Sequence, residues 1–408
     1  MSSELLCGVL VTGQGGQRRS MKRRNHIVTS LAVVLLMFGA ALHVADGRSS
    51  NAAQEDRRAF LPQVVLGNYQ GGNTPESFSF RRERAAIEFR KVRGPEEGGA
   101  VLGLGKPGAF DAVWATCPSV LFDGRIYRMW YSSFYDSHMG VGGIGMATST
   151  DGIHWKRANN GQPVLSVGPQ GAFDDGQIMG PDVDFDEHLY RMWYTGMASK
   201  WGPSGLGYYR IGLATSADGI HWTRAHGGRP VFDLGPPGSF DSVQVATPSV
   251  LRVNGKYRMW YAAWSPKTQH RICVADSRDG IHWRRENRGK PVSGLRAPYA
   301  YGPAVCRIDG QFLLLYTSSP TLPRGLYAAA SSDGFHWRIA NGGKPVLPPG
   351  SSTDIDGSLT GHACLLKIGH SLKVWYTGYR RERAGIDGWK LRIGLAEMSI
   401  GKAGRLDY

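Results

Sequence analysis

Short apolar runs alternate with turns rich in glycine and aspartate along the chain, and one turn sequence recurs. Asp-Gly-x-His-Trp occurs four times, at Asp151–Trp155, Asp218–Trp222, Asp279–Trp283 and Asp333–Trp337. The copies lie roughly 55–65 residues apart, and repetition at a fixed interval is typical of repeat architectures. A serine lies two residues before each aspartate. The repeats therefore govern the fold prediction.

Each copy belongs to a longer repeated frame. A proline-led apolar run comes first, starting at Pro118, Pro181, Pro248 and Pro303, and an aromatic run follows, starting at Tyr127, Tyr190, Tyr257 and Phe312. A strand of small residues then leads into the Asp-Gly turn, and a polar strand after the tryptophan ends at Gly-x-Pro-Val. Four short strands joined by turns, repeated in this way, predict the blades of a β-propeller.

A fifth copy is divided between the two ends of the chain. Its first strands begin at His362-Ala-Cys-Leu and continue through Val374-Trp-Tyr to Ile393-Gly-Leu-Ala, but its outer strand is missing. The segment starting at Ile87-Glu-Phe-Arg-Lys-Val matches that missing strand. We therefore predict an all-β, five-bladed β-propeller over residues 85–400, with the ring closed by an N-terminal strand that completes the last blade. Closure removes an exposed sheet edge.

The first residues have the composition of a targeting segment. Lys22, Arg23 and Arg24 precede a weakly charged apolar stretch at 27–44. Small residues at 39–41, within this stretch, offer a possible cleavage site. This pattern predicts a signal peptide or a membrane anchor within residues 1–48, and the length of 27–44 allows either. Residues 49–84 are interpreted as a linker and 401–408 as a C-terminal tail. The protein is predicted to be secreted, periplasmic or membrane-anchored, facing outside the cytoplasm.

Charge and cysteine content narrow the possible partners. The formal net charge is +15, but the basic residues are spread along the chain and form no basic helix or zinc-finger spacing, so we expect no nucleic-acid binding. The five cysteines show neither CxxC nor metal-type spacing. We therefore expect no metal and no cofactor, and interpret Cys117, Cys306 and Cys364 as apolar filler on or beside inner strands. The sequence does not indicate an oligomeric state.

Residues that recur in every copy are interpreted as structural. The Ser-x-Asp-Gly-x-His-Trp box resembles the Asp-box turn of sialidase-type propellers, and its aspartate suits a turn whose backbone N–H groups need an acceptor. Asp111, Asp174 and Asp241 also recur, as do Arg128, Arg191 and Arg258 of the aromatic runs. We predict that these carboxylates and guanidinium groups form ion pairs within or between blades. A catalytic role for Asp111 and Asp241 is the alternative.

The overall pattern of residues 85–400 resembles the five-bladed propeller glycoside hydrolase superfamily of arabinanases, xylosidases, invertases and levansucrases, with mannoside phosphorylases as relatives. The resemblance implies three acids on inner strands that act as base or nucleophile, transition-state stabiliser and general acid. The first two commonly stand immediately before the strand's proline, where this chain has Cys117 and Gly180. At the third position it has Ala246 and Thr247. This chain therefore resembles a divergent member of the superfamily that lacks the usual acidic triad.

Departures from the repeat then indicate the site. Asp182 and Asp184 stand where the other copies have Ser, Ala, Leu or Cys, and Asp175 adds a third acid to the same copy. A carboxylate in an inner-strand slot must be paired, protonated or exposed to the central channel. Asp182 and Asp175 are the candidate catalytic residues, with Asp111 and Asp241 as possible partners. The alternative is that Asp182 and Asp184 only pair with a neighbouring arginine.

Unrepeated aromatic and basic residues complete the candidate site, since aromatic rings stack on sugars and Arg or His binds polar groups. The candidate substrate-binding residues are Trp114, Tyr135, His138, Trp201, Trp264, Tyr301, Arg324, His362 and Arg381. The leading hypothesis is a glycosidase-like hydrolase acting on a glycoside or polysaccharide through carboxylates in the channel. The alternatives are a non-catalytic propeller that binds glycan or another partner, and a glycoside phosphorylase that holds phosphate with Arg324 or Arg381.

Overall fold

The computed structural model describes residues 87–134, 142–186, 188–200, 207–295, 299–318, 324–383 and 388–400. These residues fold almost entirely into β-strands joined by turns and single-turn 3-10 helices, which confirms the all-β class. None of the helices in these ranges is both long enough and apolar enough to cross a membrane. The predicted signal peptide or anchor, the linker and the C-terminal tail lie outside the described residues.

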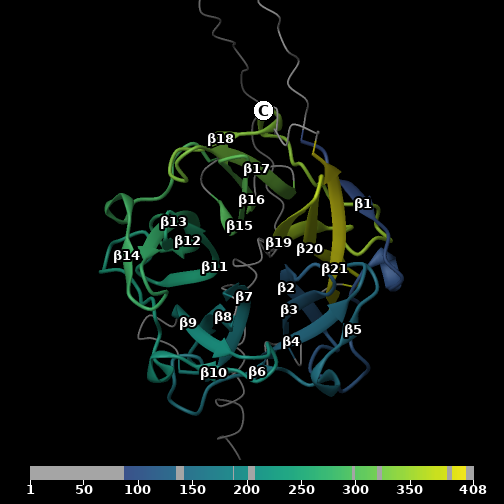
Figure 1. Cartoon of the computed structure of the whole chain (residues 1–408), viewed down its shortest axis with the longest axis horizontal. Helices are drawn as coiled ribbons and strands as arrows, with labels where there is room; N and C mark the ends of the chain where they lie inside the picture. The colour runs from purple at the N-terminus through teal and green to yellow at the C-terminus, as the bar shows by residue number, and fades with distance from the viewer. Residues whose placement is uncertain are drawn as a thin grey trace, which may run out of the picture.

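The strands pair in chain order into antiparallel units that lie around a common centre (Figure 1). The first unit contains β2 (Trp114–Phe122), β3 (Tyr127–Phe134), β4 (Gly142–Ser149) and β5 (Lys156–Arg157), with β6 (Leu165–Ser166) also on β4. The second contains β7 (Gln177–Asp186), β8 (Leu189–Met197), β9 (Tyr209–Ser216) and β10 (Thr223–Arg224).

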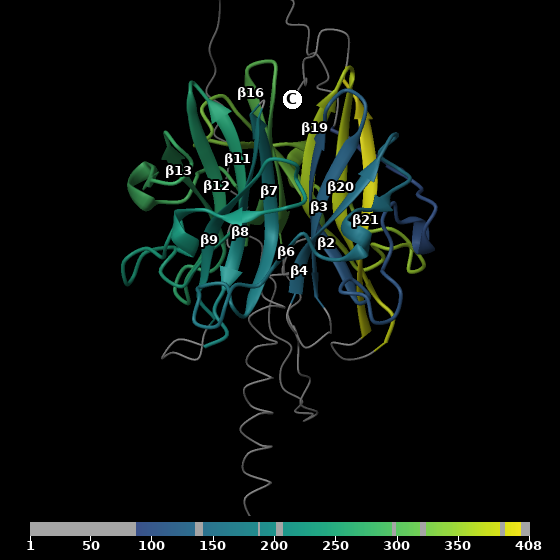
Figure 2. The ribbon, with the colours of Figure 1, turned by 60° about the horizontal axis from the view of Figure 1, so that its bottom comes forward.

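The remaining units follow the same order. The third contains β11 (Gln244–Val253), β12 (Lys256–Trp264), β13 (Arg271–Ser277) and β14 (Trp283–Arg285), and the fourth contains β15 (Tyr301–Ile308), β16 (Gln311–Ser318), β17 (Gly325–Ser331) and β18 (Arg338–Ile339). The fifth contains β19 (Leu359–Ile368), β20 (Ser371–Arg381) and β21 (Trp389–Ser399). The first strand of each unit faces the centre (Figures 1 and 2).

The N-terminal strand joins the last unit, as the sequence predicted. β1 (Arg90–Val92) pairs antiparallel with β21, with Arg90 opposite Glu397 and Val92 opposite Leu395. A one-turn helix follows β1 at Glu97–Gly99, just as one-turn helices follow the other outer strands at Asn159–Gly161, His226–Gly228, Asn287–Gly289 and Asn341–Gly343. β1 is therefore the outer strand of the fifth unit.

Tryptophan pairs link neighbouring units. In the first contact, the buried Trp130 of β3 donates its indole N–H to the carbonyl of Gly219, 2.9 Å away, and packs edge-on against Trp222 of the next turn box. Trp193, Trp260 and Trp375 repeat this contact, and Trp375 reaches Gly152 of the first unit. Large aromatic rings that bury both their faces and their N–H groups hold the units together.

The repeated turn box is structural, as predicted. In the first copy, Asp151 Oδ1 accepts the backbone N–H groups of Ile153 and His154, each at 2.8 Å, and His154 Nδ1 lies 2.7 Å from Oδ2. The same contacts recur at Asp218, Asp279 and Asp333. The aspartate satisfies turn donors that no strand partner reaches, and the histidine ring faces solvent.

The predicted ion pairs form, but with different partners. Fully buried Asp111 accepts the Tyr131 hydroxyl at 2.8 Å and Arg157 Nε at 2.6 Å. Asp174 and Asp241 repeat this arrangement with Arg224 and Arg285. Arg128, Arg191 and Arg258 instead pair with Asp123, Asp186 and Asp276. The prediction of these three arginines as partners was wrong, because the cation that reaches the buried aspartate comes from the outer strand.

The fifth unit completes the same motif with a residue from the other end of the chain. Asp356, 1% exposed, accepts the Tyr376 hydroxyl at 3.0 Å and lies 2.6 Å from Lys91 Nζ. Lys91 lies on β1, which is the outer strand here, so a lysine takes the place that arginine occupies in the first three units. The buried motif therefore spans the junction between the chain ends.

Candidate functional site

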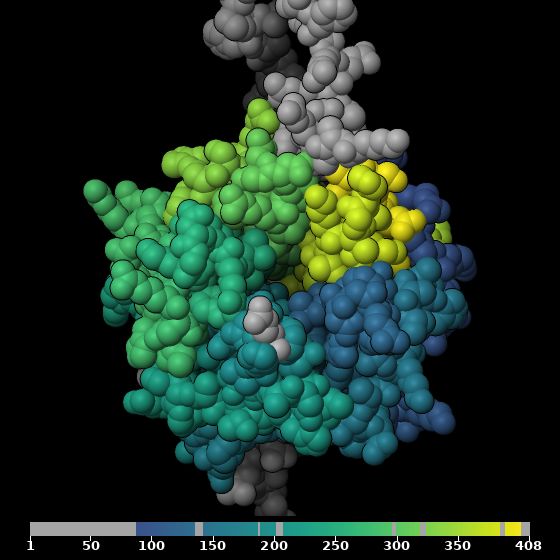
Figure 3. Space-filling model, in the orientation of Figure 1, coloured from purple at the N-terminus to yellow at the C-terminus, as the bar shows by residue number. Residues whose placement is uncertain are grey.

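A cavity of about 190 Å³ lies where the inner strands converge. Its wall comes from β2, β7, β11, β15 and β19, and the face shown in Figure 3 is hollowed at its centre. The lining repeats in layers, because each inner strand contributes equivalent positions. The sequence prediction of a functional channel between inner strands thus has a physical counterpart.

The first layer is a ring of residues with left-handed backbone. Each inner strand has a register shift at this point, and the residues there are Cys117 (φ 50°), Gly180 (φ 57°), Thr247 (φ 45°), Gly302 (φ 57°) and His362 (φ 39°). Three of the five are not glycine, and a β-branched threonine in this region is strained. The resemblance places catalytic acids at Cys117, at Gly180 and at Ala246 or Thr247, and the ring contains no acid.

Hydroxyl groups from the neighbouring unit hold this ring in place. Ser132 Oγ accepts the N–H of Gly180 at 2.8 Å, and Thr195 Oγ1 accepts that of Thr247 at 2.8 Å. Thr317 and Thr377 do the same for His362 and Cys117, at 3.2 and 3.0 Å. Four of the five ring N–H groups are therefore satisfied by the neighbouring unit, which stabilises the strained backbone.

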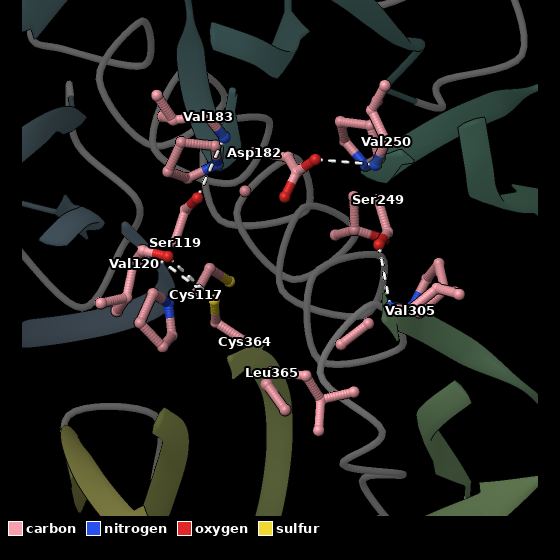
Figure 4. Close-up of a pocket in the computed structure, with 18 of the residues that line it drawn as sticks. Cys117, Ser119, Val120, Asp182, Val183, Ser249, Val250, Val305, Cys364 and Leu365 are labelled. Carbon is pink, nitrogen blue, oxygen red and sulfur yellow. Dashed lines mark hydrogen bonds between the residues drawn. The ribbon is translucent and has the colours of Figure 1, made fainter. Parts of the chain in front are cut away.

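The second layer contains Asp182. Ser119 Oγ accepts the N–H of Val183 and Ser249 Oγ that of Val305, both at 3.0 Å, whereas Asp182 Oδ2 accepts the N–H of Val250 at 2.7 Å (Figure 4). Cys364 Sγ takes the same place opposite Val120 N at 3.2 Å. Asp182 thus performs the inter-strand contact of a serine but brings a carboxyl group into the cavity.

This layer corrects the alignment of the last copy. The sequence alignment placed Ala363 opposite Ser119, but Cys364 is the residue that pairs with Trp375 and contacts the next unit. In the other copies a proline follows the left-handed residue, but in the fifth copy Ala363 follows His362. Without this proline as a marker, the sequence alignment of the fifth copy was wrong by one residue. The equivalents of Asp184 are accordingly Leu121, Leu251, Cys306 and Leu366.

Asp182 and Asp184 differ in their electrostatics. Asp184 lies 3.1 Å from Arg252 Nε, so the predicted alternative of an arginine pair holds for this residue. Within the described ranges, no cationic side chain pairs with Asp182. Burial, together with the negative charge of Asp184, raises the pKa of Asp182 to about 7, although the Val250 N–H opposes the shift. Asp182 therefore holds a proton in a large fraction of molecules near neutral pH.

The other candidate acids lie elsewhere. Asp111 and Asp241 are buried in their ion pairs and are not part of the cavity wall. Asp175 accepts the N–H groups of Ser199 and Gly171, which lowers its pKa, and it also lies off the wall. The structure does not bring these three acids together with Asp182; their catalytic role stays a prediction.

The candidate substrate-binding residues separate into three groups. Trp114, Trp264, Tyr301 and His362 are buried: Trp114 and Tyr301 begin the inner strands β2 and β15, Trp264 ends β12, and His362 lies within β19 and lines the cavity. Arg324 and Arg381 are exposed, with Arg324 Nη1 3.5 Å from the Ser358 carbonyl and Arg381 above the Trp389 ring. Tyr135, His138 and Trp201 lie outside the described residues.

His362 is neutral in this environment. Its Nδ1 lies 2.7 Å from the Tyr379 hydroxyl, and burial lowers its pKa to about 4. Burial also raises the pKa of the Cys117 thiol to about 12. The left-handed ring therefore presents neither a cation nor a thiolate to the cavity.

Sequence analysis missed Gln177, Gln244 and Thr247. Gln177 and Gln244 begin β7 and β11 and are 1% and 2% exposed. They occupy the position of Trp114 and Leu359 in the first and last units, three residues before the left-handed residue. This exchange of an apolar for a polar side chain is visible in the sequence once the left-handed positions are aligned.

No group of three or more His, Cys, Asp or Glu residues in the described part of the chain is arranged to hold a metal ion. The described cavity wall contains two carboxyl groups, Asp182 and the arginine-paired Asp184, among neutral hydrogen-bonding groups and apolar side chains.

Part of the chain is similar to known proteins. Residues 119–294, which include Asp182, match the model of the glycosyl hydrolases family 32 N-terminal domain. An uncharacterized protein of Mycobacterium tuberculosis is 30% identical over 188 residues, covering 43% of this chain and 59% of that protein. A 1,2-beta-oligomannan phosphorylase of a Thermoanaerobacter species is 26% identical over 202 residues, covering 48% and 62%. The chain thus spans less than two thirds of both relatives.

A solved structure shares the fold. The N-acetylgalactosamine deacetylase from F. plautii, in complex with blood group B trisaccharide, superimposes with a TM-score of 0.57 at 16% identity, covering 78% of this chain and 97% of that one. The repeated strands around a central cavity agree with this likeness. Over residues 119–294 the chain is similar to the glycosyl hydrolases family 32 N-terminal domain, and it shares its fold with this solved structure.

Proposed function

We propose that this protein is a carbohydrate-binding propeller that recognises a glycan at the channel, and that it does not cleave glycosides with two opposed carboxylates. Glycoside hydrolysis in this superfamily uses two acids, one to protonate the leaving oxygen and one to attack or activate water. The observation that carries the proposal is the cavity wall. Asp182 is its one carboxyl group without a cationic partner, and the left-handed ring of described residues contains no acid.

The carbohydrate part of the proposal is supported by the family and by the ligand of the similar structure. That deacetylase is named as a complex with a blood group trisaccharide. The test is a screen of the full chain against neutral and acidic oligosaccharides. Binding is measured directly, and cleavage is measured as the release of reducing sugar. Binding without release supports the proposal. If the wild-type protein releases reducing sugar and Asp182→Asn does not, the proposal is refuted and the hypothesis of a two-carboxylate hydrolase is favoured.

Asp182 favours a second candidate function, in which the protein cleaves glycosides with a single acid. Its carboxyl group is unpaired and holds a proton near pH 7, as a general acid must. In phosphorolysis, the acid gives its proton to the leaving oxygen while a phosphate oxygen bonds to the anomeric carbon, so no second carboxylate is required. The oligomannan phosphorylase relative agrees with this route. Phosphate-dependent release of sugar phosphate, lost in Asp182→Asn, distinguishes it from binding alone.

We also propose that the units are the blades of a closed five-bladed ring. Support comes from contacts between the fifth and first units: Thr377 Oγ1 with Cys117 N, Trp375 with the Gly152 carbonyl, and Cys364 Sγ with Val120 N. Export from the cytoplasm, by a cleaved signal or an anchor at 27–44, remains a proposal from the sequence. Fractionation of cells that express the full chain tests it.

A further inference from the structure

The fold uses only one oxygen of the Asp182 carboxyl group. Oδ2 accepts the N–H of Val250, whereas Oδ1 has no hydrogen bond from the described residues (Figure 4). Ser119 and Ser249, which make the equivalent inter-strand contact in two other units, are 3% and 6% exposed. Asp182 is instead partly exposed and lines the cavity. Its carboxyl group is therefore available to a ligand that enters the cavity.

The ion pairs around Asp182 leave its charge uncompensated. Arg252 pairs with both Asp184 and Asp186, at 3.1 and 3.0 Å, and Arg191 pairs with Asp186. Asp182 forms no ion pair with a described residue. Two guanidinium groups thus balance the other two carboxylates of this corner, and ionised Asp182 adds a negative charge that the cavity wall does not neutralise.

Apolar groups border the carboxyl group in the cavity. Four of the inner strands each contribute a proline to the lining, namely Pro118, Pro181, Pro248 and Pro303. Opposite charges attract more strongly where apolar groups displace water. A cationic group that reaches Asp182 is therefore held more firmly than at the open surface, and the C–H faces of a sugar ring pack on the prolines.

Among cations, an ammonium group suits this carboxyl group better than a metal ion. Calcium takes roughly six to eight oxygen ligands, and the described residues contain no group of three or more His, Cys, Asp or Glu arranged to hold a metal. An ammonium group needs one carboxylate as its ion-pair partner, and its other N–H groups can donate to water.

We propose that the cavity binds a sugar with a protonated amino group, which pairs with Asp182, and that it prefers such amino sugars to N-acetylated sugars and uronic acids. This inference rests on the proposed carbohydrate-binding function and names the class of sugar that the cavity selects. An N-acetyl group has no positive charge, so the ion pair is lost. A uronic acid brings a second carboxylate to Asp182, and like charges repel.

The repeat itself supplies the test variant. Asp182→Ser introduces the residue found at Ser119 and Ser249, whose hydroxyls accept the N–H of the next strand at 3.0 Å, so this contact can be kept while the charge is removed. Asp182→Asn removes the charge at nearly the same volume. Asp233→Asn is the matched control, because this carboxyl group is 64% exposed beside Arg210 and lies off the cavity wall.

Calorimetric titration of the full chain at neutral pH would use glucosamine, galactosamine and mannosamine, each beside its N-acetyl derivative, with galacturonic acid as the acidic probe. Losing a hydrogen bond to a charged group lowers affinity by about tenfold or more. The best-bound amine should therefore bind wild type and Asp233→Asn about tenfold more tightly than its N-acetyl derivative does. In Asp182→Ser and Asp182→Asn this preference should disappear, while a cooperative melting transition shows that both variants fold.

The other outcomes separate the inference from the proposed function. Wild-type protein that binds the N-acetyl sugars or galacturonic acid as tightly as the amines overturns the inference and leaves carbohydrate binding in place. An amine preference that persists in Asp182→Ser and Asp182→Asn also overturns it, because another group must then hold the ammonium. If no sugar binds wild type, the proposed function itself fails.

Discussion

The buried pair between Lys91 and Asp356 allows a quantitative test of how the chain ends are joined. The change is Lys91→Met, which keeps the length and apolar stem of the side chain but removes its ammonium group. Asp356, 1% exposed, would keep the Tyr376 hydroxyl and the Gly350 N–H at 3.1 Å as donors, but it would lose its cation.

The expected loss follows from burial. Removing one partner of a buried ion pair costs about 3–5 kcal/mol because the other charge stays buried. The Lys91 side chain is 32% exposed, so water reaches it and the pair is partly screened. We therefore expect Lys91→Met to lower the free energy of unfolding by about 2–4 kcal/mol.

Urea denaturation of the full chain, followed by tryptophan fluorescence, measures this loss. The matched control is Arg90→Met on the same strand, whose side chain is 78% exposed beside Glu397, so it should cost less than about 1 kcal/mol. Adding Asp356→Asn to Lys91→Met removes the buried charge and should recover part of the loss. Equal urea midpoints for Lys91→Met and Arg90→Met would refute the reasoning.

Three further predictions concern backbone, charge and the repeated turns. Gly180→Ala should destabilise the protein by about 1–2 kcal/mol in thermal unfolding, because φ is 57° and the new Cβ would lie 3.3 Å from Thr247 Cγ2; no change would contradict the strained-ring description. Because the pKa of Asp182 is raised to about 7, the native state keeps a proton on this residue that the unfolded chain releases. The contribution of Asp182 to the free energy of unfolding therefore falls as pH rises from about 4 to 7. The stability of Asp182→Asn relative to wild type should therefore increase over that range, and parallel urea midpoints would disprove the shift. His221→Ala should leave carbohydrate binding unchanged and alter stability by less than about 0.5 kcal/mol, because the imidazole is 85% exposed; lost binding would assign this turn to the site.

The repeats made the fold readable from the sequence. Every Asp-Gly-x-His-Trp copy marks the same turn, and the match between the segment at Ile87 and the outer strands predicted the pairing of β1 with β21. Local patterns suffice here because each unit repeats the same strand and turn chemistry. Where the fifth copy lacks its proline, the same reasoning misplaced Cys364 by one residue.

Side-chain partners were less predictable. The recurrence of Asp111 and Arg128 suggested an ion pair within or between blades, but Arg157 from the outer strand reaches Asp111. Sequence order does not say which of several cations of a unit points inward. Asp182 was recognisable because it breaks a repeat, and the structure adds that it replaces a serine as the acceptor for the next strand.

The buried polar residues near the left-handed ring were only partly visible in the sequence. Trp264, Tyr301 and His362 were candidates because they are unrepeated, but the absence of partners for Gln177, Gln244 and Thr247 can be seen only in three dimensions.

An experimental structure of the full chain with a bound oligosaccharide tests the central claim most directly. We predict a sugar ring in the cavity between the inner strands, beside Asp182, with no second carboxylate facing Asp182 across it. A sugar bound on the outer rim, or held between Asp182 and another acid, would contradict the account.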